Sequence, residues 1–277
     1  MHRHFRPWIA FVFAAALSAA AAGCGDDSVT NPTGMSQTDA DEIAQQLALQ
    51  LAIDNGGEMN TLNGGTTLLG ARNVRREPSD PGQPVAGQWD TSFTRGGISY
   101  ALSYMFYDLA GNLQTRFDPL TTYRLEESVT AAGTLVLPAH TASFRHVSDL
   151  EATGLGAPWD TVTFSGTTQD TALTAFKALY TDRQRWFWMS SQGTLAGLKA
   201  LKDTTVTKYP VGGTLRWTVQ AVRLRSNNRA DVEAQLDATV VVTFNGTRFP
   251  DVLVNGQWRY VFDLRNGTMV RAGWDPA

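Results

Sequence analysis

The sequence predicts a mainly β protein, an antiparallel meander of about 10–12 strands with one N-terminal helix packed on it. Three observations support this fold class: segments of alternating apolar and polar residues, evenly spaced Asn-Gly pairs, and a single helical apolar stripe near the N-terminus. Each alternating segment has one apolar face, which is typical of antiparallel sheets because parallel strands are apolar on both faces. The pattern fits a curved sheet, an open barrel or a sandwich.

Four segments alternate most clearly. They cover residues 98–108, 214–223, 238–244 and 257–265. In the last of them Trp258, Tyr260 and Phe262 share one side, while Arg259 and Asp263 point to the other. Half-buried strands of a sheet are expected to have this period of two.

Asn-Gly pairs mark the turns of the C-terminal part. Asn245-Gly246, Asn255-Gly256 and Asn266-Gly267 follow one another at spacings of 10 and 11 residues. Both residue types tolerate the positive φ of a type I′ turn, so the spacing predicts successive hairpins. Further turns are expected at 96–97, 110–112 and 212–213 because of their glycines.

One helix is expected after residue 37. Thr38 is the predicted N-cap, with Asp41 three positions later, and Ile43, Leu47 and Leu51 form an apolar stripe. The acids at 39, 41 and 42 fit the positive end of the helix dipole, and the Asn-Gly-Gly at 55–57 predicts the end. A helix lying on a membrane is the alternative, but a polar face of glutamine and acids favours packing on the sheet.

The first 23 residues have the layout of a secretory signal peptide. Arg3 and Arg6 precede an apolar run from Trp8 to Leu17, followed by alanines to residue 22. A transmembrane helix needs about 20 apolar residues, so this run is short for one.

The segment Ala21-Ala22-Gly23-Cys24 resembles the end of a bacterial lipoprotein signal, whose lipobox places small residues before an invariant cysteine. The resemblance implies that the Cys24 thiol takes a diacylglycerol, that the chain is cut before it, and that the new N-terminus is acylated. Ala21 stands where leucine is commonest in that family. Gly25, rather than aspartate, follows the cysteine, which favours the outer over the inner membrane. An ordinary signal with an incidental cysteine is the alternative.

The chain therefore divides into a signal peptide (1–23), a lipidated cysteine and tether (24–37), a helix and Gly/Pro-rich loop (38–88) and an antiparallel β-domain (89–277). A short strand is expected near 66–69. Removing the signal takes away two arginines and no acid, so the net charge changes from −3 to −5. This charge gives no electrostatic reason to expect nucleic acid as a partner.

The sequence contains no recognised catalytic or metal-binding motif, and we expect no cofactor. His140 and His146 would share one face of a strand roughly 20 Å apart, too far for one metal ion. Glu126 and Glu127 are adjacent, so they point to opposite faces and do not form a catalytic pair. No residue is therefore predicted to be catalytic or to bind a metal.

The candidate ligand-binding residues are Trp186 and Trp188, which share a face of the segment Arg185–Met189. Phe187 and Met189 share the other face. Either this strand is covered on both sides, or a curved sheet uses one apolar face as a groove for a lipid or other hydrophobic ligand. The leading hypothesis is a non-catalytic, membrane-anchored envelope lipoprotein that binds a hydrophobic ligand or an envelope protein. The alternatives are a structural envelope protein without a ligand site and a hydrolase with a dispersed active site.

Overall fold

The computed structural model describes residues 35–52, 87–95, 97–137, 140–181, 183–203, 209–224 and 232–273. These residues form one helix and twelve strands: α1 (Gln37–Leu51), β1 (Gln88–Arg95), β2 (Ile98–Asp108), β3 (Leu113–Gln114), β4 (Thr122–Leu137), β5 (His140–Thr153), β6 (Thr161–Lys177), β7 (Gln184–Leu201), β8 (Gly212–Leu224), β9 (Val232–Thr243), β10 (Asp251–Val254), β11 (Trp258–Phe262) and β12 (Met269–Arg271). The signal peptide, Cys24, the tether up to residue 34 and the expected strand at 66–69 lie outside the described residues. The helix ends earlier than the Asn-Gly-Gly at 55–57 predicted, because Leu51 is its last residue and Ala52, the C-cap, is extended.

All twelve strands belong to a single antiparallel sheet. Its order is β1-β2-β4-β5-β6-β7-β8-β9-β10-β11-β12, with β3 paired to β2, so the main path follows the chain from one edge to the other. The two edges, β1 and β12, are not paired with each other, and the sheet stays open. The predicted fold class, a mainly β meander with an N-terminal helix on it, is confirmed.

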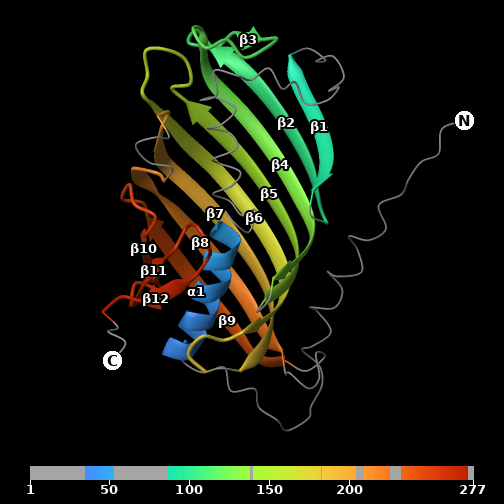
Figure 1. Cartoon of the computed structure of the whole chain (residues 1–277), viewed down its shortest axis with the longest axis vertical. Helices are drawn as coiled ribbons and strands as arrows, with labels where there is room; N and C mark the ends of the chain where they lie inside the picture. The colour runs from blue at the N-terminus through green and yellow to red at the C-terminus, as the bar shows by residue number, and fades with distance from the viewer. Residues whose placement is uncertain are drawn as a thin grey trace, which may run out of the picture. The chain divides into compact units, whose positions relative to one another are not determined.

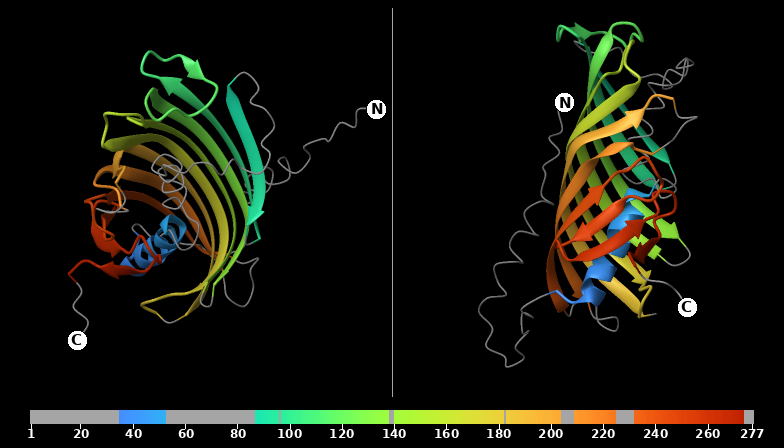
Figure 2. Two further views of the ribbon diagram at one scale, coloured as in Figure 1. Left: turned by 45° about the horizontal axis from the view of Figure 1, so that its top comes forward. Right: turned by 90° about the vertical axis from the view of Figure 1, so that its left-hand side faces the viewer.

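Of the three architectures that the pattern allowed, the structure adopts the curved open sheet. Figure 1 shows the long strands β4–β9 running side by side, and Figure 2 shows the sheet curling around α1, which lies on its concave side near β10–β12. One cause of the bending lies in β6, where the register with β7 shifts between Phe164 and Gly166. A β-bulge bends its strand and increases the local twist. Gly166 has φ +154°, and a Cβ there would come within 2.2 Å of the Asp149 carbonyl oxygen, so the bulge requires glycine.

The helix begins two residues earlier than the sequence predicted. Ser36, not Thr38, is the N-cap: its hydroxyl accepts from the Asp39 backbone N–H, and the Asp39 carboxylate accepts from the Ser36 N–H. This reciprocal pair is a capping box with aspartate in the position usually taken by glutamate. The apolar stripe is confirmed, because Ile43, Leu47 and Leu51 are fully buried against the sheet.

The three Asn-Gly pairs differ in the turns that they make. Asn255 and Gly256 have φ of 50° and 68°, and the Gln257 N–H donates to the Val254 carbonyl at 3.0 Å, which is the expected type I′ hairpin. The pairs at 245 and 266 lie in longer connections, since β9 and β10 are separated by residues 244–250 and β11 and β12 by residues 263–268. The glycines at 212 and 213, expected in a turn, instead begin β8, because Gly212 pairs with Lys199.

The hydrophobic core lies between α1 and the concave face. Phe187 and Met189 of β7, Val219 of β8 and Val240 of β9 point toward the helix side and are almost completely buried. Their neighbours along each strand point to the convex face, as the period of two requires. In the described residues no helix is long and apolar enough to cross a membrane.

Candidate functional site

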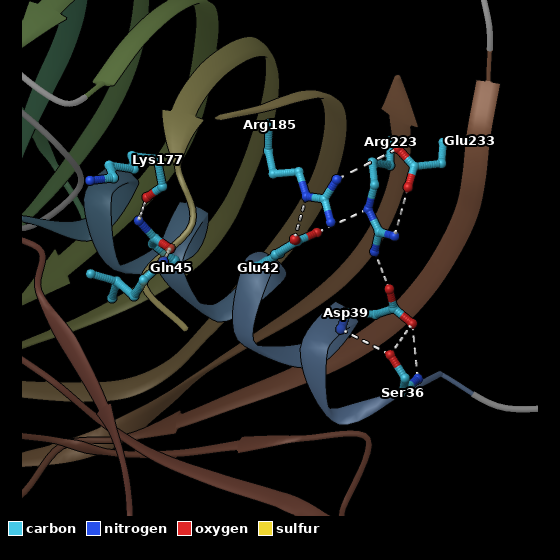
Figure 3. Close-up of polar contacts among 9 residues, drawn as sticks. Ser36, Asp39, Glu42, Gln45, Lys177, Arg185, Arg223 and Glu233 are labelled. Carbon is cyan, nitrogen blue, oxygen red and sulfur yellow. Dashed lines mark hydrogen bonds and ion pairs between the residues drawn. The ribbon is translucent and has the colours of Figure 1, made fainter. Parts of the chain in front are cut away.

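A buried ionic cluster holds the N-terminal end of α1 on the sheet. Arg223 of β8 donates from Nε to a Glu42 oxygen at 3.0 Å and from its terminal nitrogen to Asp39. Arg185 of β7 donates from Nε to the other Glu42 oxygen at 2.9 Å. Figure 3 shows these contacts, with Glu233 of β9 3.7 Å from Arg185 and 3.8 Å from Arg223. The acids that the sequence assigned to the helix dipole therefore also bind arginines that lie far away in the chain.

The pKa values of the two buried carboxylates, Glu42 and Asp39, shift in opposite directions. Burial raises the pKa of Glu42, and the nearby Arg223 and Arg185 offset only part of that effect. Burial also acts to raise the pKa of Asp39, but hydrogen bonds from Ser36 and the charge of Arg223 outweigh it, so the pKa is lowered. The pKa of Arg223 is raised because Glu42 and Asp39 more than offset its burial. The cluster is therefore a coupled buried network, in which the loss of one partner leaves another charge unpaired.

A second polar anchor fixes the opposite side of the helix. Arg271 of β12 binds Asp41 through two nitrogens, one of them at 3.0 Å, and the Tyr260 hydroxyl donates to the same carboxylate at 2.9 Å. Gln37 donates to Asp41 and to the Tyr260 hydroxyl. The two anchors place α1 over the C-terminal half of the concave face, and both views of Figure 2 show it on the β7–β12 side.

The N-terminal half of the concave face carries an aromatic strip on β1 and β2, formed by Trp89, Phe93, Tyr100, Tyr104 and Phe106. Trp89 stacks on Tyr104 with ring centroids 6.2 Å apart, and Phe93 stacks on Tyr100 at 4.9 Å. Each pair lies directly opposite in the β1–β2 register, so the rings share one face. All five side chains are at least partly exposed, and Phe93 is 47% exposed. Burial, and then the charge of Glu127, raise the pKa of Tyr104.

The central strands carry a polar patch, formed by His146, Ser148, Thr168, Asp170, Ser191 and the indole nitrogen of Trp217. His146, Asp170 and Ser191 lie directly opposite one another on β5, β6 and β7. The His146 Nδ1 and an Asp170 oxygen are 2.7 Å apart, and the Ser191 hydroxyl donates to the other oxygen at 3.5 Å. Apolar rows flank the patch on both sides, with Leu150 and Leu195 in one and Ala172 and Met189 in the other.

The order of residues in the polar patch differs from that of a catalytic triad. In a Ser-His-Asp triad the histidine lies between the other two and receives the serine proton. Here Asp170 lies in the middle, and the Ser191 hydroxyl donates to the carboxylate rather than to the imidazole. The geometry suits hydrogen-bond recognition better than nucleophilic attack. Among the described residues, no group of three or more His, Cys, Asp or Glu side chains could hold a metal ion.

The candidate tryptophans lie on the other side of the sheet. Trp186 and Trp188 point to the convex face of β7, opposite Ala175 and Leu173 of β6, while Phe187 and Met189 point to the core. Trp188 is 39% exposed, so the convex side of the strand is not covered there. The structure does not bring this pair together with the aromatic strip or the polar patch. Cys24 lies outside the described residues.

The sequence contained two signals for the concave site. The alternation over 98–108 places Tyr100 and Tyr104 on one apolar face of a strand, without indicating that this face stays partly exposed. Gly193 in the middle of β7 is the second signal, because glycine inside a strand often marks a close approach of another group. Comparisons of the chain with protein-family models, curated proteins and solved structures found no match.

Proposed function

We propose that this protein is a membrane-anchored envelope lipoprotein whose concave face binds a hydrophobic ligand without chemical reaction. The observation that carries the ligand proposal is the aromatic strip on β1 and β2. Its five rings lie on the concave side of a curved sheet, in the half away from α1. Phe93 is exposed and the other four rings are half-buried, with Tyr104 and Phe106 also packing against the edge of the core. Contiguous exposed apolar surface is typical of binding grooves, because a soluble domain otherwise buries such side chains.

The contrast with the other half of the concave face supports the same proposal. There the apolar residues of β7–β9 are packed against α1 and are almost completely buried. A purely structural protein would be expected to cover both halves in this way. In this proposal the ligand covers the apolar face of β1 and β2, as α1 covers the face of β7–β12.

The membrane part of the proposal is supported by the sequence around Cys24. This cysteine is the only one in the chain and follows Ala-Ala-Gly after an apolar run. Two or more acyl chains give stable anchoring, whereas a single chain binds only marginally. We place the protein in the outer rather than the inner membrane because Gly25 follows the cysteine.

The ligand proposal is tested by analysing the lipid that co-purifies with the full-length protein after mild detergent extraction from a bacterium that processes lipoproteins. A Tyr100→Ser, Tyr104→Ser double variant should carry at least about tenfold less ligand, since each buried aromatic contributes about 1.5–3 kcal/mol. The matched control is Trp186→Ser, Trp188→Ser on the convex face, which should keep its ligand. Absence of any bound hydrophobic molecule in the parent protein would favour the structural alternative.

The anchor is tested by Cys24→Ala. This variant should move from the membrane fraction to the soluble fraction, because the thiol that takes the lipid is gone. Unchanged membrane association after a carbonate wash would refute the lipoprotein assignment and leave the ligand proposal standing.

A further inference from the structure

Three polar atoms of the polar patch are buried and have no hydrogen-bond partner among the described residues. They are the Ser148 hydroxyl, the Thr168 hydroxyl and the Trp217 indole nitrogen, whose residues are 1%, 4% and 2% exposed. They belong to one row across the sheet, since Ser148 lies opposite Thr168, Thr168 opposite Gly193, and Gly193 opposite Trp217. Buried polar groups are normally paired, so three unpaired atoms in one row require an explanation.

Gly193 brings two of these atoms together. A Cβ at this position would lie 2.3 Å from the Thr168 hydroxyl oxygen and 2.7 Å from the Trp217 indole nitrogen. The Trp217 indole on β8 and the Thr168 hydroxyl on β6 therefore both crowd the space over Gly193 of β7, which a side chain at 193 would fill. Glycine weakens the interior of a strand, so its presence here serves the close approach.

The arrangement is unfavourable in the absence of a further partner. Each unsatisfied buried group costs about 1–3 kcal/mol, whereas alanine or valine at 148 and 168 would cost nothing of this kind. A molecule that supplies hydrogen bonds to all three atoms would recover that free energy. The aromatic strip lies close by, since Tyr100 on β2 aligns with Ala131 on β4 and His146 on β5, two strand spacings or about 10 Å away.

We propose that the polar patch binds the uncharged, oxygen-bearing head group of an amphipathic ligand, an ester, amide or hydroxyl, whose apolar part lies along the aromatic strip. This inference rests on the proposed function and names the chemistry of its ligand. The Trp217 N–H is only a donor, so it requires an acceptor oxygen on the ligand. The Ser148 and Thr168 hydroxyls can each donate or accept a hydrogen bond. They can therefore bind the remaining lone pairs of that oxygen or a hydroxyl on the ligand.

The charges around the patch favour a neutral head group. Asp170 lies two residues from Thr168 on the same face and is bonded to His146, so even with a protonated imidazole this pair has no net positive charge. The arginines of β7 and β8 that point to the concave side, Arg185 and Arg223, bind Glu42 and Asp39. A carboxylate or phosphate would therefore enter a buried region beside Asp170, where the described residues supply no free counter-charge.

The test is a Ser148→Ala, Thr168→Val double variant of the full-length protein, with monooleoylglycerol as the neutral probe and oleate as the anionic one. The variant should bind monooleoylglycerol at least about tenfold more weakly, because two hydrogen bonds are lost. Its urea midpoint without ligand should be unchanged or higher, because neither hydroxyl has a partner within the described ranges of the chain. Ser143→Ala, Thr171→Val on the convex face of the same strands is the matched control and should bind like the parent.

The outcomes separate this inference from the proposed function. If the double variant binds monooleoylglycerol as the parent does while Tyr100→Ser, Tyr104→Ser does not, the groove stands and the polar patch holds only water. Equal affinity of the parent for oleate and monooleoylglycerol would overturn the neutral head group. If the parent binds neither probe and carries no co-purified lipid, both proposals are wrong.

Discussion

The concave and convex faces of the sheet are built from the same strands and differ in almost every physical respect. On β6–β8 the convex face presents threonine, glutamine and serine to solvent, whereas the concave face presents Phe187, Val219 and similar residues to the core. Charged side chains on the concave face are paired with α1 or with a neighbouring strand, as at the buried Arg223 and the half-buried Asp170. A hydroxyl on the convex face therefore has little effect on the free energy of folding, whereas an unpaired hydroxyl buried on the concave face destabilises the fold. This difference is the reason for assigning a ligand to the polar patch.

Substituting the arginines of β8 is expected to give the largest difference between the faces in the free energy of unfolding. Arg223→Met should lower the free energy of unfolding by about 3–5 kcal/mol, because Glu42 and Asp39 stay buried beside an apolar side chain. The matched control is Arg216→Met on the exposed convex face of the same strand, which should change it by less than about 0.5 kcal/mol. Chemical denaturation of both variants measures the difference. Equal effects would mean that the ionic cluster does not hold the helix on the sheet.

A smaller effect is expected from His140, which lies opposite Phe176 on the concave face. Burial lowers the pKa of His140 from 6.5 to about 4. Between these two values the unfolded chain binds a proton that the folded protein does not, so stability is complete above pH 6.5 and is lost as the pH falls toward 4. The loss amounts to about 3 kcal/mol at 1.36 kcal/mol per pKa unit.

The variant that tests this is His140→Leu, with urea denaturation at several pH values from 4 to 7. The difference in stability between parent and variant should change across this window, which isolates His140 from Glu42 and Asp39. The raised pKa of Glu42 acts in the opposite direction, because the folded protein then takes up its proton more readily than the unfolded chain. A pH-independent difference would show that His140 does not titrate as a buried group.

The smallest effect is expected from one substitution made on both faces of β8. Val219→Thr replaces a fully buried methyl with a hydroxyl in the core and should cost about 1–3 kcal/mol. Val222→Thr makes the same change on the half-buried convex side and should stay within about 0.5 kcal/mol. Thermal or chemical unfolding measures both. A negligible cost at 219 would remove the argument that buried hydroxyls at 148 and 168 need a ligand.

The sequence predicted local structure well where one strand face meets the core. The alternation over 98–108 gave the bounds of β2, and the segment 214–223 lies within β8. The Asn255-Gly256 turn was predictable because both positive φ values are encoded in two adjacent residues. The start of α1 was misplaced by two residues, since Ser36 and Thr38 are both good caps and the contact that selects Ser36 is its reciprocal bond with Asp39.

The candidate site was harder to predict from the sequence, because its residues lie far apart in the chain. The bond between Arg223 and Asp39 joins residues 184 positions apart, and the polar patch combines residues from four strands. The tryptophans at 186 and 188 were candidates because their segment has large apolar side chains on both faces of one strand. Their period of two placed them on one face, but only the side occupied by the helix decided that this face is the convex one.

By itself the sequence determined that the chain forms an antiparallel meander with an amphipathic helix, and it supplied the reason to expect a lipid at Cys24. Short-range patterning is sufficient for this, because a period of two and a period of 3.6 are read within a few residues. The tertiary structure alone decided that the sheet stays open, where α1 covers it, and which side chains meet on its concave face. These depend on register and curvature, which are set by packing across many strands and not by any one segment.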